Sequence, residues 1–215
     1  SRLRGTCAAL LASPLLLVLA ACGGGGTPAA APEASASLAL EKRGPPPATS
    51  KTVTAQECDR SVLGDTISPE SIGEPVSGIT LNDWTWVAAT ANTPAYCRVG
   101  GSMTPIDPAA PPINFRVALP STWNYRYVQV GGGGMNGSTP GLTGGPGAGT
   151  PTYLARGWAV AGSDSGHSGF GAEWALNDEA MKNLGYMQMK KTRDAAWVLM
   201  KRLYGGKPYF AYAST

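Results

Sequence analysis

The stretch Tyr125–Ser138 reads Tyr-Arg-Tyr-Val-Gln-Val-Gly-Gly-Gly-Gly-Met-Asn-Gly-Ser and carries the strongest fold signal in the chain. Its first half, residues 125–130, alternates bulky with polar side chains and is rich in aromatic and β-branched types, which predicts a strand. Four consecutive glycines follow, residues 131–134. Glycine has no side chain to pack, so the run indicates backbone that takes positive φ angles and lies close against another group. A strand that ends in such a loop is how α/β proteins build anion or oxyanion sites.

The composition is that of one domain with a hydrophobic core. The 215 residues are 43% hydrophobic and 14% charged, with a net charge of +3, and a chain of this size can bury a sizeable core. The basic residues are scattered along the sequence, which argues against nucleic-acid binding. Because there is one histidine and no group of carboxylates, we expect neither a metal site nor a cofactor.

Residues 1–21 predict a lipoprotein signal peptide. Two arginines precede an apolar run, residues 8–20, that is too short to span a bilayer. The run ends in Leu-Ala-Ala-Cys22, which resembles a bacterial lipobox. An ordinary signal peptide and a short buried helix are the alternatives. Acylation of Cys22 would anchor an exported protein to a membrane at the cell surface or in the periplasm; otherwise the protein would be secreted.

Residues 22–51 predict a disordered linker, because their Gly, Ala, Pro and Ser composition cannot bury enough apolar surface to fold. The folded domain is expected at residues 52–215. Cys58 and Cys97 are the only cysteines beyond the anchor. Export to an oxidising compartment favours a disulfide between them, with two free buried thiols as the alternative. The bridge would close a loop of about 40 residues and contribute on the order of 4 kcal/mol.

The remaining elements alternate in a way that predicts an α/β fold. Asn177 is expected to cap a short helix, and Gly185 interrupts the pattern before a longer helix over about 186–204. The apolar face of the longer helix is expected to consist of Ala195, Ala196, Leu199, Met200 and Leu203. Further strands are expected around Trp84 and Trp86 and at residues 98–103, 113–119, 158–162 and 209–212. The order strand, loop, strand, helix, strand implies a mostly parallel sheet with crossover helices. A strand that leads into a serine after such a helix is what precedes the nucleophile elbow of an α/β-hydrolase.

From about Cys58 onward the chain resembles the tannase and feruloyl esterase family, which includes the terephthalate monoester hydrolases. The motifs that carry the resemblance keep the family's order and spacing: Leu119-Pro-Ser-Thr-Trp-Asn, the run 130–138, Ser163-Asp-Ser-Gly-His, Ala175-Leu-Asn, Gly185-Tyr, and Tyr204-Gly before Tyr209-Phe. The resemblance implies an α/β-hydrolase of which this chain holds only the N-terminal part of the catalytic sheet, ending at the nucleophile elbow and lacking the lid domain. The Cys58–Cys97 pair also matches a disulfide near the family's N-terminus.

The resemblance implies a secreted or surface serine esterase that acts on esters of phenolic or aromatic acids. Ser214 aligns with the family's nucleophile, and the backbone N–H groups of Gly134 and Thr215 with its oxyanion donors. The family places Gly and Cys before the serine, whereas this chain has Tyr212 and Ala213. Tyr212 is bulky where an elbow needs close approach, and Ala213 removes the family's cysteine bridge to the segment of the catalytic histidine. The catalytic aspartate and histidine would lie beyond residue 215, so we expect an N-terminal fragment without esterase activity of its own.

The only histidine is the obvious candidate for a catalytic base. In its Ser-Asp-Ser-Gly-His loop we expect His167 instead to order the loop through hydrogen bonds, and Asp164 to be a loop residue as well. Tyr153, Trp158 and Trp174 could line an aromatic pocket, although core packing is expected for Trp158. The expected partner is a small aromatic ester, with membrane contact only through the lipid anchor. The alternative function is a non-catalytic surface lipoprotein that binds aromatic or carbohydrate ligands on a degenerate hydrolase scaffold.

Overall fold

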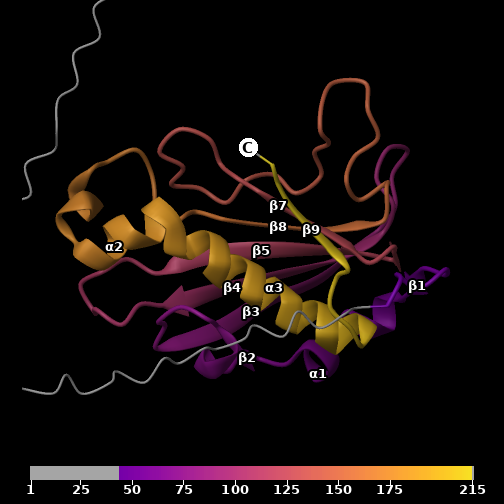
Figure 1. Ribbon diagram of the computed structural model, residues 1–215, viewed down its shortest axis with the longest axis horizontal. Coiled ribbons are helices and arrows are strands. Elements are labelled where there is room, and N and C mark those ends of the chain that lie inside the picture. Colours follow the sequence, from indigo (N-terminus) through magenta and orange to yellow (C-terminus); the bar gives the residue numbers. More distant parts are fainter. Residues whose placement is uncertain (1–43, 215) are drawn as a thin grey trace, which may run out of the picture. The chain divides into compact units, whose positions relative to one another are not determined.

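A mixed seven-stranded sheet forms the centre of the fold in the computed structural model, which describes residues 44–214 (Figure 1). The predicted signal peptide, Cys22, most of the predicted linker and Thr215 lie outside the described residues. The strand order is β2-β3-β4-β5-β8-β7-β9. The strands of this sheet are β2 (Thr66–Ile67), β3 (Gly78–Val87), β4 (Tyr96–Thr104), β5 (Ile113–Pro120), β7 (Arg126–Val130), β8 (Trp158–Ser163) and β9 (Phe210–Ser214).

A separate ribbon of two short strands marks the start of the folded part. β1 (Lys51–Thr52) pairs antiparallel with β6 (Thr122–Trp123), and Lys51 lies opposite Trp123. Lys51 was expected at the end of the linker, but its backbone pairs with the segment before β7.

The sheet is less parallel than the sequence suggested. Only β8, β7 and β9 run parallel to one another, whereas every neighbouring pair from β2 to β8 is antiparallel. The expectation of a mostly parallel sheet is therefore wrong. Residues 88–95 and 105–112, which join β3 to β4 and β4 to β5, are too few for the crossover that a parallel pair requires, so these strands form antiparallel hairpins. The α/β class itself is confirmed.

A long helix covers one face of the sheet and connects β8 to β9 (Figure 1). It begins with α2 (Asp178–Lys182), whose N-terminus is capped by Asn177 as predicted. A π-helical turn, Asn183–Met187, leads without a gap into α3 (Gln188–Tyr204), so Gly185 marks a wider turn and not a break. The predicted apolar face of α3 is buried: Ala195, Ala196, Leu199, Met200 and Leu203. Gly205 ends the helix with a left-handed φ of 78°.

The two faces of the sheet are covered differently. α3 packs on one face, above a core that includes Phe115, Trp123 and Tyr127. On the other face, Leu142, Tyr153 and Leu154 pack against the sheet, so the long connection between β7 and β8 covers the sheet in place of a second helix. This connection is therefore fixed to the sheet both near its middle, at Leu142, and near its end, at Tyr153 and Leu154.

The short elements before β3 are tied to the sheet covalently. They are the 3-10 helix Ala55–Glu57, α1 (Arg60–Leu63) and the 3-10 helix Pro69–Ser71, and a further 3-10 helix, Glu173–Leu176, precedes α2. A disulfide joins Cys58 to Cys97 in β4, so the two cysteines that export was expected to oxidise are bonded to each other.

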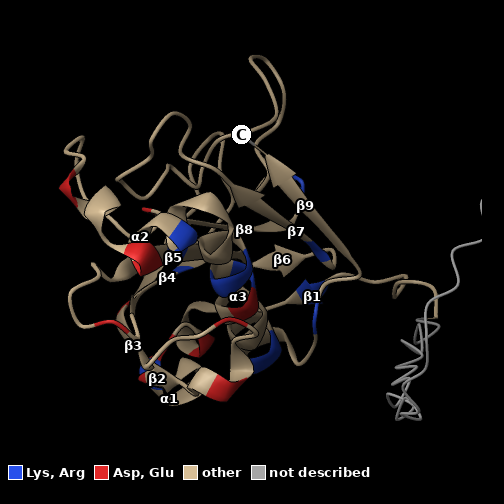
Figure 2. Ribbon diagram, turned by 60° about the vertical axis from the view of Figure 1, so that its left-hand side comes forward, with Lys and Arg blue, Asp and Glu red and all other residues tan. Residues whose placement is uncertain are grey.

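Charged residues are distributed over many elements. Within residues 44–214, Lys and Arg occur on β1, β7, α3 and the loops, interspersed with Asp and Glu (Figure 2). Within the same residues, no helix has the length and apolarity needed to cross a bilayer.

Candidate functional site

The carboxyl ends of the three parallel strands lie at one edge of the sheet. β7 ends in the glycine run, β8 ends at Ser163 before the Asp-Ser-Gly-His loop, and β9 ends at Ser214. Chain order and sheet order differ here, because the chain passes from β7 to β8 on one side and then to β9 on the other. Ligand crevices of open α/β sheets lie at such a switch of strand order. The predicted nucleophile and the predicted oxyanion loop therefore share the edge where a site is expected.

Ser214 lies directly beside the start of the glycine run. In the parallel pair of β7 and β9, Ser214 is the partner of Val130. The backbone N–H of the next residue, Gly131, donates a 2.7 Å hydrogen bond to the carbonyl oxygen of Ser214. The hydroxyl of Ser214 accepts a 3.0 Å hydrogen bond from the phenol of Tyr153. The Tyr153 contact could not be found from the sequence, because nothing there relates two residues that lie 61 positions apart.

The middle of the glycine run leaves its backbone donors uncommitted. Gly133 and Gly134 have φ angles of 66° and 52°, in the left-handed region that favours glycine. A Cβ at either residue would meet open space. Among the described residues, the N–H groups of Gly132, Gly133 and Gly134 donate no hydrogen bond. They include the N–H of Gly134, which the sequence predicts as an oxyanion donor.

Asp164 fixes its own loop to β5. Its carboxylate accepts hydrogen bonds from the backbone N–H of Asn114 (3.0 Å), the Asn114 side-chain amide (2.7 Å) and the backbone N–H of Gly166 (3.0 Å). Burial raises the pKa of Asp164, and these three donors oppose the shift. Asp164 is thus a loop residue, as expected, and its carboxylate is occupied by these donors.

His167 packs in a way that the sequence did not predict. Its ring is only 2% exposed and stacks on Trp174, with centroids 4.4 Å apart. Within residues 44–214 neither ring nitrogen has a hydrogen-bond partner. The expectation that His167 orders its loop through hydrogen bonds is therefore wrong, because stacking on Trp174 holds the ring. The imidazole also makes no hydrogen bond to Ser214.

Tyr212 and Ala213, the two residues before Ser214 that differ from the family pattern, both lie in β9. Tyr212 stacks on Trp158, with centroids 4.9 Å apart, and Trp158 stacks on Tyr153 at 5.6 Å. The bulk of Tyr212 thus packs on an aromatic neighbour. Ala213 lines a groove of about 360 Å³ between β7, β9 and the long helix, and Tyr212 borders the same groove. Trp158, expected in the core, is the half-buried centre of this aromatic stack.

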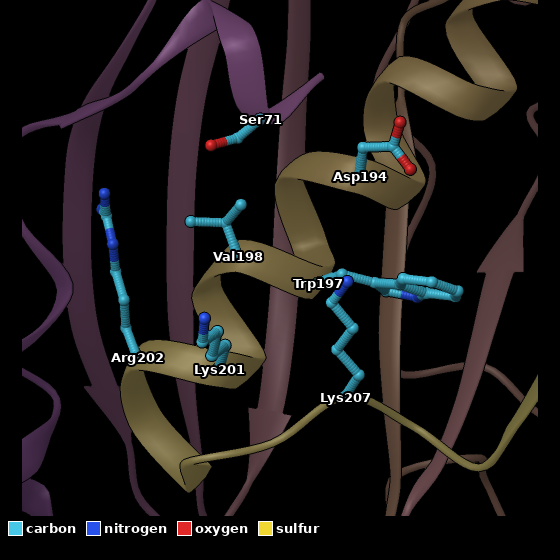
Figure 3. A pocket seen from close by; sticks show the side chains of 7 residues that line it. All are labelled: Ser71, Asp194, Trp197, Val198, Lys201, Arg202 and Lys207. Carbon is cyan, nitrogen blue, oxygen red and sulfur yellow. The ribbon is translucent and has the colours of Figure 1, made fainter. Parts of the chain in front are cut away.

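Another groove lies away from this edge of the sheet. It has a volume of about 530 Å³ and lies on the outer face of α3, and its lining residues come from α3, Ser71 and Lys207 (Figure 3). It shares no residue with the carboxyl edge of the parallel strands. The convergence of the ends of β7, β8 and β9 therefore identifies the candidate site. Residues 44–214 contain no group of three or more His, Cys, Asp or Glu side chains that could hold a metal ion.

One family model and two related proteins match the sequence of this chain. The model of the family described as "Tannase and feruloyl esterase" matches residues 97–215. An uncharacterized esterase of Agrobacterium fabrum is 40% identical over 168 residues, which are 72% of this chain and 30% of that protein. The mono(2-hydroxyethyl) terephthalate hydrolase of Piscinibacter sakaiensis is 31% identical over 139 residues, covering 57% of this chain and 23% of the hydrolase. The chain therefore spans less than a third of the length of these relatives.

Two solved structures, of a feruloyl esterase and of a tannin acyl hydrolase, are similar to this chain at low sequence identity. Feruloyl esterase B from Aspergillus oryzae superimposes with a TM-score of 0.48 at 21% identity, over 64% of this chain and 28% of the esterase. Tannin acyl hydrolase from Aspergillus niger gives a TM-score of 0.47 at 18% identity, over 78% of this chain and 33% of the hydrolase.

Proposed function

Because the chain belongs to the tannase and feruloyl esterase family, we propose that its gene product is a carboxylic ester hydrolase with Ser214 as the nucleophile. The substrate class we propose is esters of aromatic or phenolic acids. The name of the Piscinibacter relative, a terephthalate monoester hydrolase, supports this class. The family description supports it as well.

One observation supports the proposal most directly. The carbonyl oxygen of Ser214 accepts a hydrogen bond from the N–H of Gly131, the first residue of a glycine loop whose following N–H groups have no partner among the described residues. In ester hydrolysis the serine hydroxyl oxygen attacks the carbonyl carbon, and the carbonyl oxygen becomes an oxyanion. Backbone N–H groups that point at this oxygen stabilise it, and losing one such donor typically slows catalysis by about 10²- to 10³-fold. In this proposal Gly134 supplies one donor and Thr215, which follows the nucleophile, supplies the other.

The proton of Ser214 needs a base, and we propose that it comes from outside this chain. The single histidine, His167, is buried against Trp174 and makes no hydrogen bond to Ser214. The Ser214 hydroxyl instead accepts a hydrogen bond from the phenol of Tyr153. The 215-residue chain is therefore expected to show no esterase turnover by itself, and the catalytic histidine and aspartate are expected in a later part of the gene product.

The test is hydrolysis by the full-length gene product of methyl ferulate, propyl gallate and mono(2-hydroxyethyl) terephthalate. We expect turnover of at least one of these esters, and loss of turnover in Ser214→Ala. Ser121→Ala is the matched control, because Ser121 directly follows β5, which runs antiparallel to β8, and therefore lies at the opposite edge of the sheet. Turnover that survives Ser214→Ala would overturn the assignment of the nucleophile. Binding of aromatic acids or carbohydrates without turnover would favour the non-catalytic alternative, to which the departures at Tyr212 and Ala213 point.

We further propose that the protein is an exported lipoprotein acylated at Cys22, as the lipobox-like sequence before that residue suggests. Metabolic labelling with an alkyne fatty acid in a bacterial host tests this. The label is expected on the wild-type protein and not on Cys22→Ser. An unlabelled wild type, or a label that persists in Cys22→Ser, would contradict it.

A further inference from the structure

We propose that Asn136 is the positioning residue of the glycine loop, defined here as residues 131–135. Its side chain holds the loop in the conformation that leaves the N–H groups of Gly132, Gly133 and Gly134 free to donate. The structural part of this inference concerns the loop alone. Its catalytic consequence rests on the function proposed above.

The amide of Asn136 joins the glycine loop to the end of β8. Its Nδ2 atom donates to the carbonyl oxygen of Ser163 at 2.7 Å and to the hydroxyl of Ser165 at 2.8 Å. The carbonyl of Ser163 can only accept, so the nitrogen side of the amide must face it. The orientation of the amide is therefore fixed by its partners, and Oδ1 is directed back toward the glycines.

Gly132 is the residue that makes room for this side chain. A Cβ at Gly132 would overlap the Oδ1 and Cγ atoms of Asn136. No group of the described residues donates a hydrogen bond to that buried Oδ1 atom. The second glycine of the run is thus required by the Asn136 side chain, whereas Gly133 and Gly134 are required by their positive φ angles.

The backbone on both sides of the loop is anchored, which leaves Asn136 to control the part between. At the start of the loop, the N–H of Gly131 donates a hydrogen bond to the carbonyl oxygen of Ser214 in β9. Just beyond the loop, the N–H of Gly137 donates to the Asp164 carbonyl at 3.2 Å, and Gly137 accepts from the N–H of Gly169 at 2.9 Å. Asn136 itself has a φ of 40°, which asparagine tolerates better than most residues, and its N–H donates to Gly133 at 3.0 Å.

Asn136→Asp is the sharpest variant, because it keeps the shape and the tolerance of positive φ but replaces the donor with an acceptor. A carboxylate oxygen would then face the Ser163 carbonyl. Asn136→Gly removes the side chain and relieves the backbone. The matched control is Asn124→Asp, since Asn124 also donates its amide to a backbone carbonyl, that of Arg156, at 2.6 Å. Asn124 lies in the turn before β7, at the opposite end of that strand from the glycine loop.

The first test follows backbone dynamics and hydrogen exchange by NMR in the 215-residue chain. In the wild type we expect order parameters near 0.85 for the amides of Gly132–Gly134, falling below about 0.6 in both Asn136 variants. Exchange at the Gly137 and Gly169 amides should accelerate at least tenfold. Asn124→Asp should leave both readouts unchanged. Rigid glycine amides in Asn136→Asp would overturn the proposal, whether or not the gene product hydrolyses any ester.

The second test is a double-mutant cycle between Gly132→Ala and Asn136→Gly, measured as unfolding equilibrium constants. In the wild type, Gly132→Ala should raise the unfolding equilibrium constant. In the Asn136→Gly background this rise should be at least tenfold smaller, because the overlapping amide is gone. Independent effects of the two changes would contradict the contact.

The third test measures esterase kinetics on the full-length gene product. Asn136→Asp should lower kcat by about 10²-fold with little change in KM, as expected when oxyanion donors are misplaced. Asn124→Asp should retain kcat. An active Asn136→Asp enzyme with unchanged kcat would overturn the catalytic consequence. A gene product that hydrolyses no ester would instead count against the proposed function, and the two other tests would still decide the role of Asn136.

Discussion

The backbone N–H of Gly131 donates a 2.7 Å hydrogen bond to the carbonyl oxygen of Ser214. This bond continues the parallel ladder of β7 and β9 by one residue beyond the pairing of Val130 with Ser214. It sets the beginning of the glycine loop beside the proposed nucleophile through backbone atoms alone. The relation therefore depends on the strand register and not on the side chains at either position.

The disulfide is expected to stabilise the fold strongly. Cys58 and Cys97 are 39 positions apart, and closing a loop of this size contributes about 4 kcal/mol on the chain-entropy model. Replacing both cysteines with serine should lower the free energy of unfolding by an amount of this order. Urea unfolding of the two proteins measures the difference, and a reducing agent should destabilise only the wild type. Equal stability of the two proteins would contradict the prediction.

The Tyr212–Trp158 stack should contribute measurably beyond the area it buries. Aromatic pairs in such geometry typically contribute about 0.5–1.5 kcal/mol, and these ring centroids are 4.9 Å apart. We expect a coupling energy in this range from a double-mutant cycle of Tyr212→Leu and Trp158→Leu in urea unfolding. Additive losses would show that Tyr212 is not held by Trp158.

Asp164 should make stability depend on pH at acidic values. Burial raises its pKa in the folded state above the usual 3.8, so between 3.8 and the raised pKa the folded state binds more protons than the unfolded state. The free energy of unfolding then falls as pH rises through this window. Subtracting the free energy of unfolding of Asp164→Asn from that of the wild type isolates the contribution of Asp164, since all other carboxylates are present in both proteins. The difference, wild type minus variant, should decrease from pH 3.5 upward and become constant; a difference that rises with pH would contradict the assignment.

Lys191 should have a pH effect of the opposite sign. The residue is fully buried, its ammonium donates to Asn183 at 2.8 Å, and it lies 3.6 Å from Glu179. Burial lowers the pKa of Lys191 below 10.5, against the opposing effect of Glu179. Between the lowered pKa and 10.5 the unfolded state binds more protons, so the contribution of Lys191 to stability rises with pH.

The comparison for Lys191 is with Lys191→Met, by urea unfolding at alkaline pH. The difference in free energy of unfolding, wild type minus variant, should increase up to about pH 10.5. The buried phenols of Tyr127 and Tyr204, whose pKa values are raised by burial, act equally on both proteins and cancel. A difference that stays constant over the range would contradict a lowered pKa.

The sequence predicted the elements of the site better than their contacts. Alternation and the glycine run located β7, and the spacing of Ala195, Leu199 and Leu203 located the buried face of α3. The antiparallel half of the sheet was missed, because alternation describes one strand and does not identify its neighbours. Gly185 predicts an interruption, since glycine weakens a helix whether or not the helix continues, but the structure has a π-helical turn there.

Side-chain partners were the least predictable part. His167 is an ionisable residue in a polar loop, which suggested hydrogen bonding, yet it stacks on Trp174. The sequence suggests a pocket position for Tyr153, and its hydrogen bond to Ser214 follows only from how the connection between β7 and β8 packs on the sheet. Asn136 belongs to a quoted motif, but its role depends on the overlap with Gly132, which requires coordinates.

Covalent labelling with a fluorophosphonate tests the central claim most directly. An activated serine attacks phosphorus and releases fluoride, and the stable adduct identifies the nucleophile by mass. In the full-length gene product the account predicts one adduct, on the peptide that contains Ser214, with parallel loss of ester hydrolysis and no adduct in Ser214→Ala. An adduct on another serine, or persistent hydrolysis with Ser214 fully labelled, would contradict it.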